Sequence, residues 1–440
     1  MSKFTVSLVR YEKPLESVAK AVELCGGLGR IGASAKVFIK PNIVYWTKAV
    51  PFPKWGVITT SRVVRDMVEL LAAHGVGDIT IGEGMVQGRP GDNETPAHAF
   101  LTLGYQELAK RFGVKVVNTF ERPFEEVDLG GGMKLSFNAD ALHSDFIVDL
   151  PVMKTHAQTT VSLSIKNLKG LIDINSRKRC HNPDPQKDLH LWVSRLHRGL
   201  PPVFALIDGI YTSERGPGMD GTMHRSNLLV GSWDALSADL VGASLLGQDP
   251  AQVPHLAHVA RQDGRPLDLC DVEVLGERIE DLAKPHEWTF PYNEDGSLPL
   301  PMVQRGMSGV NFYKYDSTMC TYCSSVNGVV LTAIALAWKG QPWDDVEVLT
   351  GKMMQPRPGA KKTVLLGKCM YQAHKDNPGI AHMIPVKGCP PKPEQIIEAM
   401  HQAGIMIDPA IIMGMDRLPG SYMKRYKDKP EFDENLFRVM

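Results

Sequence analysis

The sequence predicts an α/β protein in two parts, a parallel-sheet region at residues 1–300 and a second α/β domain at residues 308–440. Short apolar runs alternate with helix-like segments along the chain, and polar or glycine-rich turns follow many of these runs. A stretch rich in proline and glycine, residues 282–307, separates the two parts. The first part can itself form two lobes with a break near residue 150.

Four apolar runs in the first part are expected to be parallel strands. They lie at residues 36–39, 78–81, 146–150 and 203–207, with a further short strand at 114–117 and helices at 61–74 and 237–246. In parallel sheets, ligands bind beyond the carboxyl ends of the strands. One edge of the sheet should therefore collect the polar side chains of Lys40, Asn42, Glu83, Lys154, His156 and Asp208.

Two segments of the first part lack a regular apolar pattern. Residues 177–202 are rich in Arg, His and Pro and are interpreted as a long loop or a lid. Residues 214–224 contain Gly216-Pro217-Gly218 and are interpreted as a second loop. Five histidines are expected to be surface or loop residues, namely His143, His181, His190, His197 and His224.

A basic stretch follows the strand predicted at 146–150. Three lysines, a histidine and an asparagine lie within seventeen residues and are flanked by apolar positions. Lysine is a common partner of phosphate and carboxylate groups, and a cluster of lysines lowers the pKa of its members by mutual repulsion. The alternative is a solvated basic loop. We predict catalytic roles for Lys154, His156, Lys166, Asn167 and Glu83, and substrate-binding roles for Lys40, Asn42, Lys169 and Asp208.

The second part repeats the pattern of strand, turn and helix. Strands are expected at 345–350, 363–366 and 382–386, and helices at 325–338 and 393–403. Cysteines stand at the turns of this pattern. A Cys-x-x-Cys pair precedes the first helix, Gly-Lys-Cys follows the second strand, and Gly-Cys-Pro-Pro follows the third.

Four cysteines, Cys320, Cys323, Cys369 and Cys389, are therefore expected at one edge of the second sheet. Four thiolates are the ligand set of a [4Fe-4S] cluster. We predict one such cluster, with glycines before Cys369 and Cys389 that let the backbone approach it closely. The alternatives are a structural zinc site with four cysteine ligands, a redox-active Cys-x-x-Cys without metal, and unrelated buried cysteines.

Composition narrows the functional class. Lys+Arg and Asp+Glu both number 49, so no overall field favours nucleic acid or an anionic membrane. The longest apolar run, at 329–338, is too short to span a bilayer, and the first residues lack the apolar core of a signal peptide. We expect a cytoplasmic protein, in which clustered cysteines are metal ligands or catalytic thiols. Its expected partners are a small anionic substrate and a redox partner protein, and a homo-oligomer is left open.

The motifs resemble two known families. Cys320-Thr321-Tyr322-Cys323, Gly367-Lys368-Cys369 and Gly388-Cys389-Pro390-Pro391 resemble the proximal-cluster domain of nickel–iron hydrogenase small subunits, over roughly residues 315–405. This resemblance implies one [4Fe-4S] cluster in a flavodoxin-like domain.

A second resemblance covers roughly residues 5–275. Lys40-Pro41-Asn42, Gly82-Glu83-Gly84, Lys154-Thr155-His156 and Lys166-Asn167-Leu168-Lys169-Gly170, with Asp208-Gly209 and Gly216-Pro217-Gly218, resemble the DUF362 family in order and spacing. Members of this family often carry cysteine-ligated clusters, many in a C-terminal ferredoxin-type segment that this chain lacks, which implies one cluster rather than two. A weaker likeness to the lactate-racemase-like fold suggests a cleft between domains.

Three functions are compatible with these motifs. The first is an oxidoreductase in which a cluster passes single electrons to an anionic substrate, while His156 or Glu83 transfers protons. The second is a non-redox lyase or isomerase in which the cluster is a Lewis acid, a role that four available cysteines count against. The third is an electron carrier or an assembly protein for a partner metalloenzyme. No Walker A or complete GxGxxG motif is present, so ATP and NAD are not implied. A flavin is compatible with the sequence but is not implied either.

Overall fold

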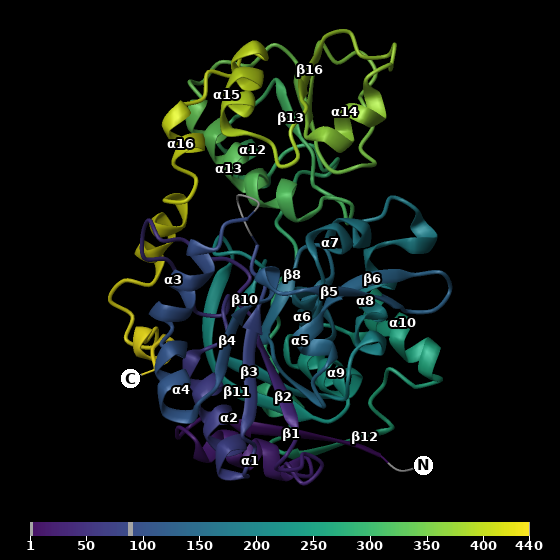
Figure 1. The fold of residues 1–440 in the computed structure, drawn as a ribbon. Coiled ribbons are helices and arrows are strands. Elements are labelled where there is room, and N and C mark those ends of the chain that lie inside the picture. Colours follow the sequence, from purple (N-terminus) through teal and green to yellow (C-terminus); the bar gives the residue numbers. More distant parts are fainter. Residues whose placement is uncertain (1–2, 87–90, 440) are drawn as a thin grey trace.

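A computed structural model describes residues 3–86 and 91–439 as two sheets, each covered by helices (Figure 1). The α/β class predicted from the sequence is confirmed. The larger sheet occupies the lower part of Figure 1, and the smaller sheet lies above it. None of the helices in the described ranges is both long enough and apolar enough to cross a bilayer.

The larger sheet has ten strands and is mainly parallel. Its path runs β12-β1-β11-β10-β7-β2-β3-β4, and β8 and β9 branch from β10. The strands are β1 (Phe4–Arg10), β2 (Lys36–Pro41), β3 (Asp78–Glu83), β4 (Lys115–Asn118), β7 (Phe146–Leu150), β8 (Val152–His156), β9 (Thr160–Ser162), β10 (Val203–Glu214), β11 (Thr222–Ser232) and β12 (Val272–Gly276). Strands β4, β3, β2, β7 and β10 are all parallel, so the ends of β2, β3 and β7 meet at one edge.

Helices cover both faces of this sheet because its buried strands are apolar on both sides. On β2, Val37 and Ile39 enter one core and Phe38 enters the other. The first core is covered by α1 (Glu16–Leu24), α2 (Ser61–Ala73), α3 (Glu94–Thr102) and α4 (Tyr105–Phe112). The second is covered by α6 (Ser164–Asn167), α8 (Leu189–Ser194), α9 (Ala235–Leu245) and α10 (Pro254–Asp263). Smaller elements are the hairpin β5 (Phe124–Asp128) and β6 (Lys134–Asn138), and helices α5 (Ala139–Leu142), α7 (Ile174–Cys180) and α11 (Ile279–Leu282).

The interpretation of residues 177–202 as a loop or lid is wrong. This segment contains the end of α7 and the whole of α8, and Leu189, Trp192, Val193 and Leu196 are buried in the second core. Their spacing of three and four residues is that of one helix face, which the charged and proline residues around it obscure. The segment is therefore packed into the fold.

The smaller sheet has four parallel strands in consecutive order, β13 (Val310–Phe312), β14 (Val346–Leu349), β15 (Lys362–Leu366) and β16 (Met383–Val386). Its helices are α12 (Leu300–Gln304), α13 (Thr321–Ala337), α14 (Lys368–His374), α15 (Pro393–Gln402) and α16 (Pro409–Met413). Flavodoxin-like sheets have the order 2-1-3-4-5. The consecutive order among the described residues differs from that expectation, although the parallel α/β character is as predicted.

The C-terminal segment returns from the smaller sheet to the larger one. It runs down the side of the molecule and ends beside α4 (Figure 1). Tyr426, Phe437 and Val439 are buried in the first core, and the Tyr211 hydroxyl donates to the Glu431 carbonyl at 2.9 Å. The domain ranges 1–300 and 308–440 stay a prediction, but the last residues of the chain pack on the first part.

Candidate active site

A cavity of about 850 Å³ lies between the two parts, at the carboxyl ends of the parallel strands. Every site residue predicted in the first part except Asp208 lines it, namely Lys40, Asn42, Glu83, Lys154, His156, Lys166, Asn167 and Lys169. The second part contributes α13 to its wall, from Thr321 to Ala335. The sheet-edge argument therefore finds the place, and the second part encloses it.

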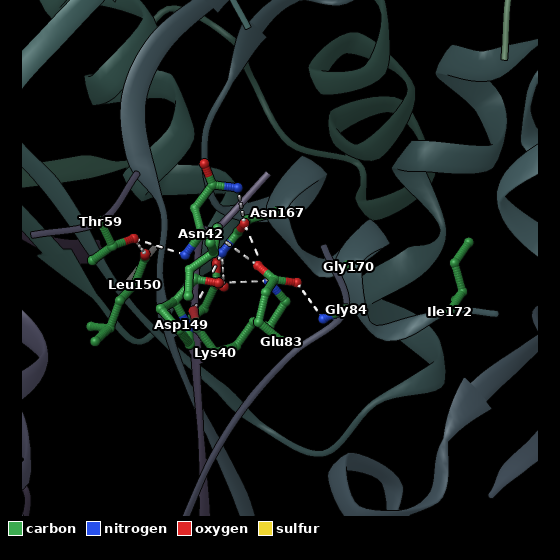
Figure 2. A network of polar contacts seen from close by, with 12 residues as sticks. Lys40, Asn42, Thr59, Glu83, Gly84, Asp149, Leu150, Asn167, Gly170 and Ile172 are labelled. Carbon is green, nitrogen blue, oxygen red and sulfur yellow. Dashed lines mark hydrogen bonds and ion pairs between the residues drawn. The ribbon is translucent and has the colours of Figure 1, made fainter. Parts of the chain in front are cut away.

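A buried ion pair forms the floor of the site (Figure 2). The Lys40 ammonium contacts Glu83 Oε2 at 2.6 Å, with side-chain exposures of 0% and 3%. The backbone N–H groups of Ile43 and Gly84 donate to the same carboxylate at 2.9 and 2.8 Å. Both carboxylate oxygens of Glu83 are thus in use, and this residue holds the strand ends together.

Gly170 packs directly on this ion pair. A Cβ atom at Gly170 would lie 2.6 Å from both Glu83 Oε1 and Lys40 Cε, closer than such contacts are found. The glycine of the Lys-Asn-Leu-Lys-Gly motif therefore allows the short helical segment at residues 164–171 to approach the ends of β2 and β3.

A chain of amide hydrogen bonds connects this floor to Lys154 (Figure 2 shows its Asn42–Asn167–Asp149 part). Lys154 Nζ donates to Asn42 Oδ1 at 2.6 Å, and Asn42 Nδ2 donates to Asn167 Oδ1 at 2.9 Å. Asn167 Nδ2 in turn donates to Asp149 Oδ1 at 2.7 Å. Each amide has one donor and one acceptor in use, so the chain fixes the orientation of both asparagines.

Lys154 has the environment of a proton-transfer group. Burial lowers its pKa to about 7. Its nitrogen donates to Asn42 Oδ1 and, at 2.8 Å, to the Val57 carbonyl. In the neutral amine both protons are used by these bonds, so the lone pair is the remaining direction, and Lys154 lines the cavity.

Lys166 and Lys169 lie three residues apart on the continuous helical segment 164–171, which places them on one face. The Lys166 ammonium has no hydrogen bond or ion pair to any residue in the described ranges, and burial lowers its pKa well below the usual value. Lys169 Nζ contacts His181 Nε2 at 2.9 Å, and burial lowers its pKa to about 8. Neither group has a carboxylate partner among the described residues, so both are available to an anionic ligand.

His156 faces the same cavity as a neutral imidazole. Burial, with the charges of Lys166 and Lys154, lowers its pKa well below the usual value. Its Nδ1 accepts the backbone N–H of Gln158 at 3.0 Å, which leaves the proton on Nε2. His156 can therefore donate a hydrogen bond to a ligand. It lies on strand β8 rather than in the turn that the sequence suggested.

Three buried polar residues in or beside the site escape the sequence argument. His181 is buried rather than on the surface, and its Nδ1 lies 2.7 Å from the Ser317 carbonyl of the second part. Arg177 donates to the Gly170 carbonyl at 2.7 Å and covers the Phe120 ring. Asp149 lies inside the otherwise apolar strand β7, and burial raises its pKa to about 7. The only sequence signal for Arg177 and His181 is that they follow the basic stretch closely along the chain.

Asp208 is not part of the cavity wall. Its carboxylate accepts the backbone N–H groups of Thr60 at 2.7 Å and of Ile210 at 3.0 Å. Thr60 is the residue before α2, so Asp208 ties the start of that helix to β10. The strand predicted to end at residue 207 continues through Asp208 to Glu214, which carries this carboxylate away from the sheet edge.

The four cysteines lie close enough for their charges to interact. Cys320 immediately precedes α13, and a hydrogen bond from Cys323, with the N–H groups of Tyr322 and Cys323, lowers its pKa to about 5. The charges of Cys320, Cys369 and Cys389 all act on Cys323. Cys320 is buried, Cys323 is half-buried, and Cys369 and Cys389 are exposed.

A cluster or a zinc ion at these four cysteines stays a prediction. In residues 3–86 and 91–439, no three His, Cys, Asp or Glu side chains are placed to hold one metal ion. A zinc ion needs every sulfur within about 2.3 Å of itself, whereas each iron of a cubane takes its own thiolate, so the sulfurs stand farther apart. At Gly367, where φ is +99°, a Cβ atom would lie 3.1 Å from Cys323 Sγ. A glycine there keeps this space open.

Comparison with known proteins agrees with the motifs of the first part. Residues 37–244 match the family described as "Domain of unknown function (DUF362)". The matched range contains every cavity residue discussed above from β2 through α8.

Two further proteins are similar to this chain. A thylakoid-associated protein, sll1697, of Synechocystis sp. (strain ATCC 27184 / PCC 6803 / Kazusa) is 26% identical over 267 residues, which is 58% of this chain and 78% of that protein. The lactate racemase apoprotein of Thermoanaerobacterium thermosaccharolyticum has 15% identity and a TM-score of 0.33, over 56% of this chain and 57% of its own. The chain thus spans little more than half the length of that structure.

Proposed function

We propose that the protein is an iron–sulfur oxidoreductase that acts on an anionic substrate in the cavity between its two parts. Cys320, Cys323, Cys369 and Cys389 would hold one [4Fe-4S] cluster. When bound, the cluster would supply or accept single electrons. One observation carries the proposal: α13 begins directly after Cys320, and its first turns line the same cavity as the buried lysines.

The cysteine side and the lysine side of this cavity are electrostatically connected. The charge on Cys320 acts on Lys169 and opposes the lowering of its pKa by burial. Between them, Gln158 donates to the Asp316 and Met319 carbonyls at 2.8 and 2.9 Å. The segment before the Cys-x-x-Cys pair is thus fixed to the turn that follows the strand carrying His156, which supports electron exchange between the two sides.

Within the proposed reaction, Lys166 and Lys169 bind the anionic group because neither has a carboxylate partner of its own. Lys154 is positioned to take or return a proton, since a pKa near the operating pH suits that task. His156 donates a hydrogen bond from Nε2. Glu83 is assigned to positioning, because its oxygens are occupied by Lys40 and two N–H groups.

A non-redox isomerase or lyase is the second candidate. The observation that favours it is the pair of a neutral base, Lys154, and a neutral donor, His156, on one cavity wall. Proton abstraction and return need no electron transfer. A pure electron carrier or assembly protein, in contrast, would leave this cavity without a role.

The decisive experiment is anaerobic purification followed by iron and sulfide analysis and by electron paramagnetic resonance before and after reduction. The proposal expects about four irons and four sulfides per chain, with a signal that changes on reduction. Cys389→Ser should lower the iron content, and Cys270→Ser, a change at an exposed cysteine outside the group, should not. A colourless protein with zinc, or equal iron loss in both variants, would refute the cluster.

The two candidates separate in the same preparation. An oxidoreductase loses substrate-dependent reoxidation of the reduced cluster when Lys166 is changed to Met. A non-redox enzyme exchanges substrate protons with solvent at the same rate whether the cluster is oxidised or reduced.

A further inference from the structure

The cavity is much larger than a small anion requires. A volume of about 850 Å³ lies near the upper end of the range that holds ligands of drug size. One headgroup on Lys166 and Lys169 would occupy a fraction of it. The other residues of the cavity wall therefore indicate the chemistry of the rest of the ligand.

Helix α13 shows how the wall changes along the cavity. Near Cys320 its lining residues are polar, with Thr321, Ser324 and Ser325, and farther along they include Val329, Leu331 and Ala335. Thr332 interrupts this apolar part, but its hydroxyl donates to the Gly328 carbonyl at 2.8 Å. Fourteen residue steps of about 1.5 Å each separate Thr321 from Ala335, so the cavity extends about 21 Å along the helix.

Aromatic rings also line the cavity. They come from separate segments and are all partly buried: Tyr45, Phe290, Tyr292, Tyr315 and Tyr422. Tyr292 and Tyr315 are within electrostatic range of each other, and the Arg425 guanidinium covers the Tyr422 ring at 4.7 Å. Such rings bind flat apolar groups and leave their hydroxyls free for water.

The apolar end is closed by chain that returns from the second part. Met415, Leu418 and Pro419 line the cavity, and they lie beyond α16, which contacts α13. Met302 and Pro301 of α12 line it as well. The cavity therefore has two lysines without a carboxylate partner among the described residues at the Cys320 end of α13, and apolar side chains along the far end of that helix.

We infer that the ligand of this cavity is an elongated amphipathic anion, with its phosphate or carboxylate group on Lys166 and Lys169 and a ring-bearing apolar body along the distal half of α13. The inference rests on the proposed function only in taking the lysine site as the substrate site. It replaces the small anion expected from sequence by a larger molecule. A substrate and a tightly held flavin mononucleotide share this chemistry, and the test distinguishes them.

The test is a series of phosphates with a growing apolar body. Inorganic phosphate, phenyl phosphate and biphenyl-4-yl phosphate are titrated into the full-length protein by calorimetry. Each ring buries apolar surface, so affinity should increase about tenfold per ring. A fluorescent flavin released on heating the purified protein would identify the bound anion as the cofactor. If no chromophore is released, the anion that binds this cavity is the substrate.

Three variants locate the binding. Lys166→Met should weaken all three phosphates at least tenfold. Ala335→Trp should fill the distal end and remove the gain of the second ring, while inorganic phosphate binds as before. Trp288→Ala is the control, because this exposed aromatic does not line the cavity, and it should leave the whole series unchanged.

Equal affinities along the series, or a gain that Ala335→Trp leaves intact, would overturn the inference. Iron analysis of the same samples separates this failure from failure of the proposed function. A protein with about four irons per chain and a flat series keeps the cluster and loses the amphipathic ligand. A protein without iron whose affinity increases along the series keeps the amphipathic ligand and loses the cluster.

Discussion

Lys166 is the residue on which anion binding depends most, because no residue that the structure describes pairs with its ammonium. Lys166→Met keeps the length of the side chain and removes the charge. We expect anion affinity to fall by about ten- to a hundredfold, which corresponds to about 1.4–2.7 kcal/mol. The melting temperature should stay equal or rise, since a buried amine without a protein partner is replaced by an apolar side chain of similar length.

Lys187→Met is the matched control for that change. Lys187 is an exposed lysine outside the cavity, and its replacement should alter neither quantity. If the Lys166 variant binds phosphate with the affinity of the natural protein, Lys166 is not part of the anion site.

Anion binding should also take up protons, because Lys154 and Lys169 have pKa values of about 7 and about 8 in the free protein. A bound anion favours the charged forms and raises both pKa values. At pH 8 we therefore expect Lys154 and Lys169 together to take up about one proton per phosphate bound, and much less at pH 6, where both groups are already charged. Lys166, whose pKa burial also lowers, adds to the uptake. Calorimetry in buffers of different ionisation enthalpy measures it.

The same two lysines determine whether folding stability increases or decreases with pH. Their pKa values are about 7 and about 8 folded and about 10.4 unfolded. Between these limits the unfolded chain binds more protons, so the free energy of unfolding should increase as pH rises from 7 to 10. Without bound anion, a decrease across that window would contradict the buried state of these lysines.

At the scale of elements, the close contact between the helical segment 164–171 and strands β2 and β3 depends on Gly170. Gly170→Ala should destabilise the protein by about 1–3 kcal/mol, because the new methyl group would overlap Glu83 and Lys40. Denaturant unfolding measures the loss. Gly77→Ala is the control, since nothing lies within 4 Å of a Cβ there. Equal losses of stability in both variants would show that the Lys40–Glu83 pair accommodates the new methyl group without strain.

The ends of the parallel strands were the part of the site that the sequence could predict. Lys40, Glu83 and Asn42 follow apolar runs, and strand topology alone places them together. The helical nature of residues 177–202 could not be foreseen, because charged residues and prolines hide the apolar face that α8 buries. His181 was misjudged for a different reason, since its burial depends on contact with the second part through Ser317.

On the whole-molecule scale, the C-terminal segment holds the two parts against each other. Five residues between Met415 and Arg425 line the cavity, and Tyr426, Phe437 and Val439 enter the first core. A chain that ends after Gly414 should lose more than about 3 kcal/mol of stability, at about 1.5–3 kcal/mol per buried large side chain. It should also bind biphenyl-4-yl phosphate no better than inorganic phosphate. Unchanged melting and an unchanged phosphate series would contradict this role.

The account's central claim is that one cavity joins a cysteine-held cluster to a lysine-held anion. The most direct measurement is crystallography on the anaerobic protein with biphenyl-4-yl phosphate, with data collected at the iron absorption edge. The account predicts anomalous density among Cys320, Cys323, Cys369 and Cys389, and a phosphate group beside Lys166 and Lys169 in the cavity that α13 lines. Anomalous density elsewhere, none at the cysteines, or a phosphate bound outside this cavity would contradict it.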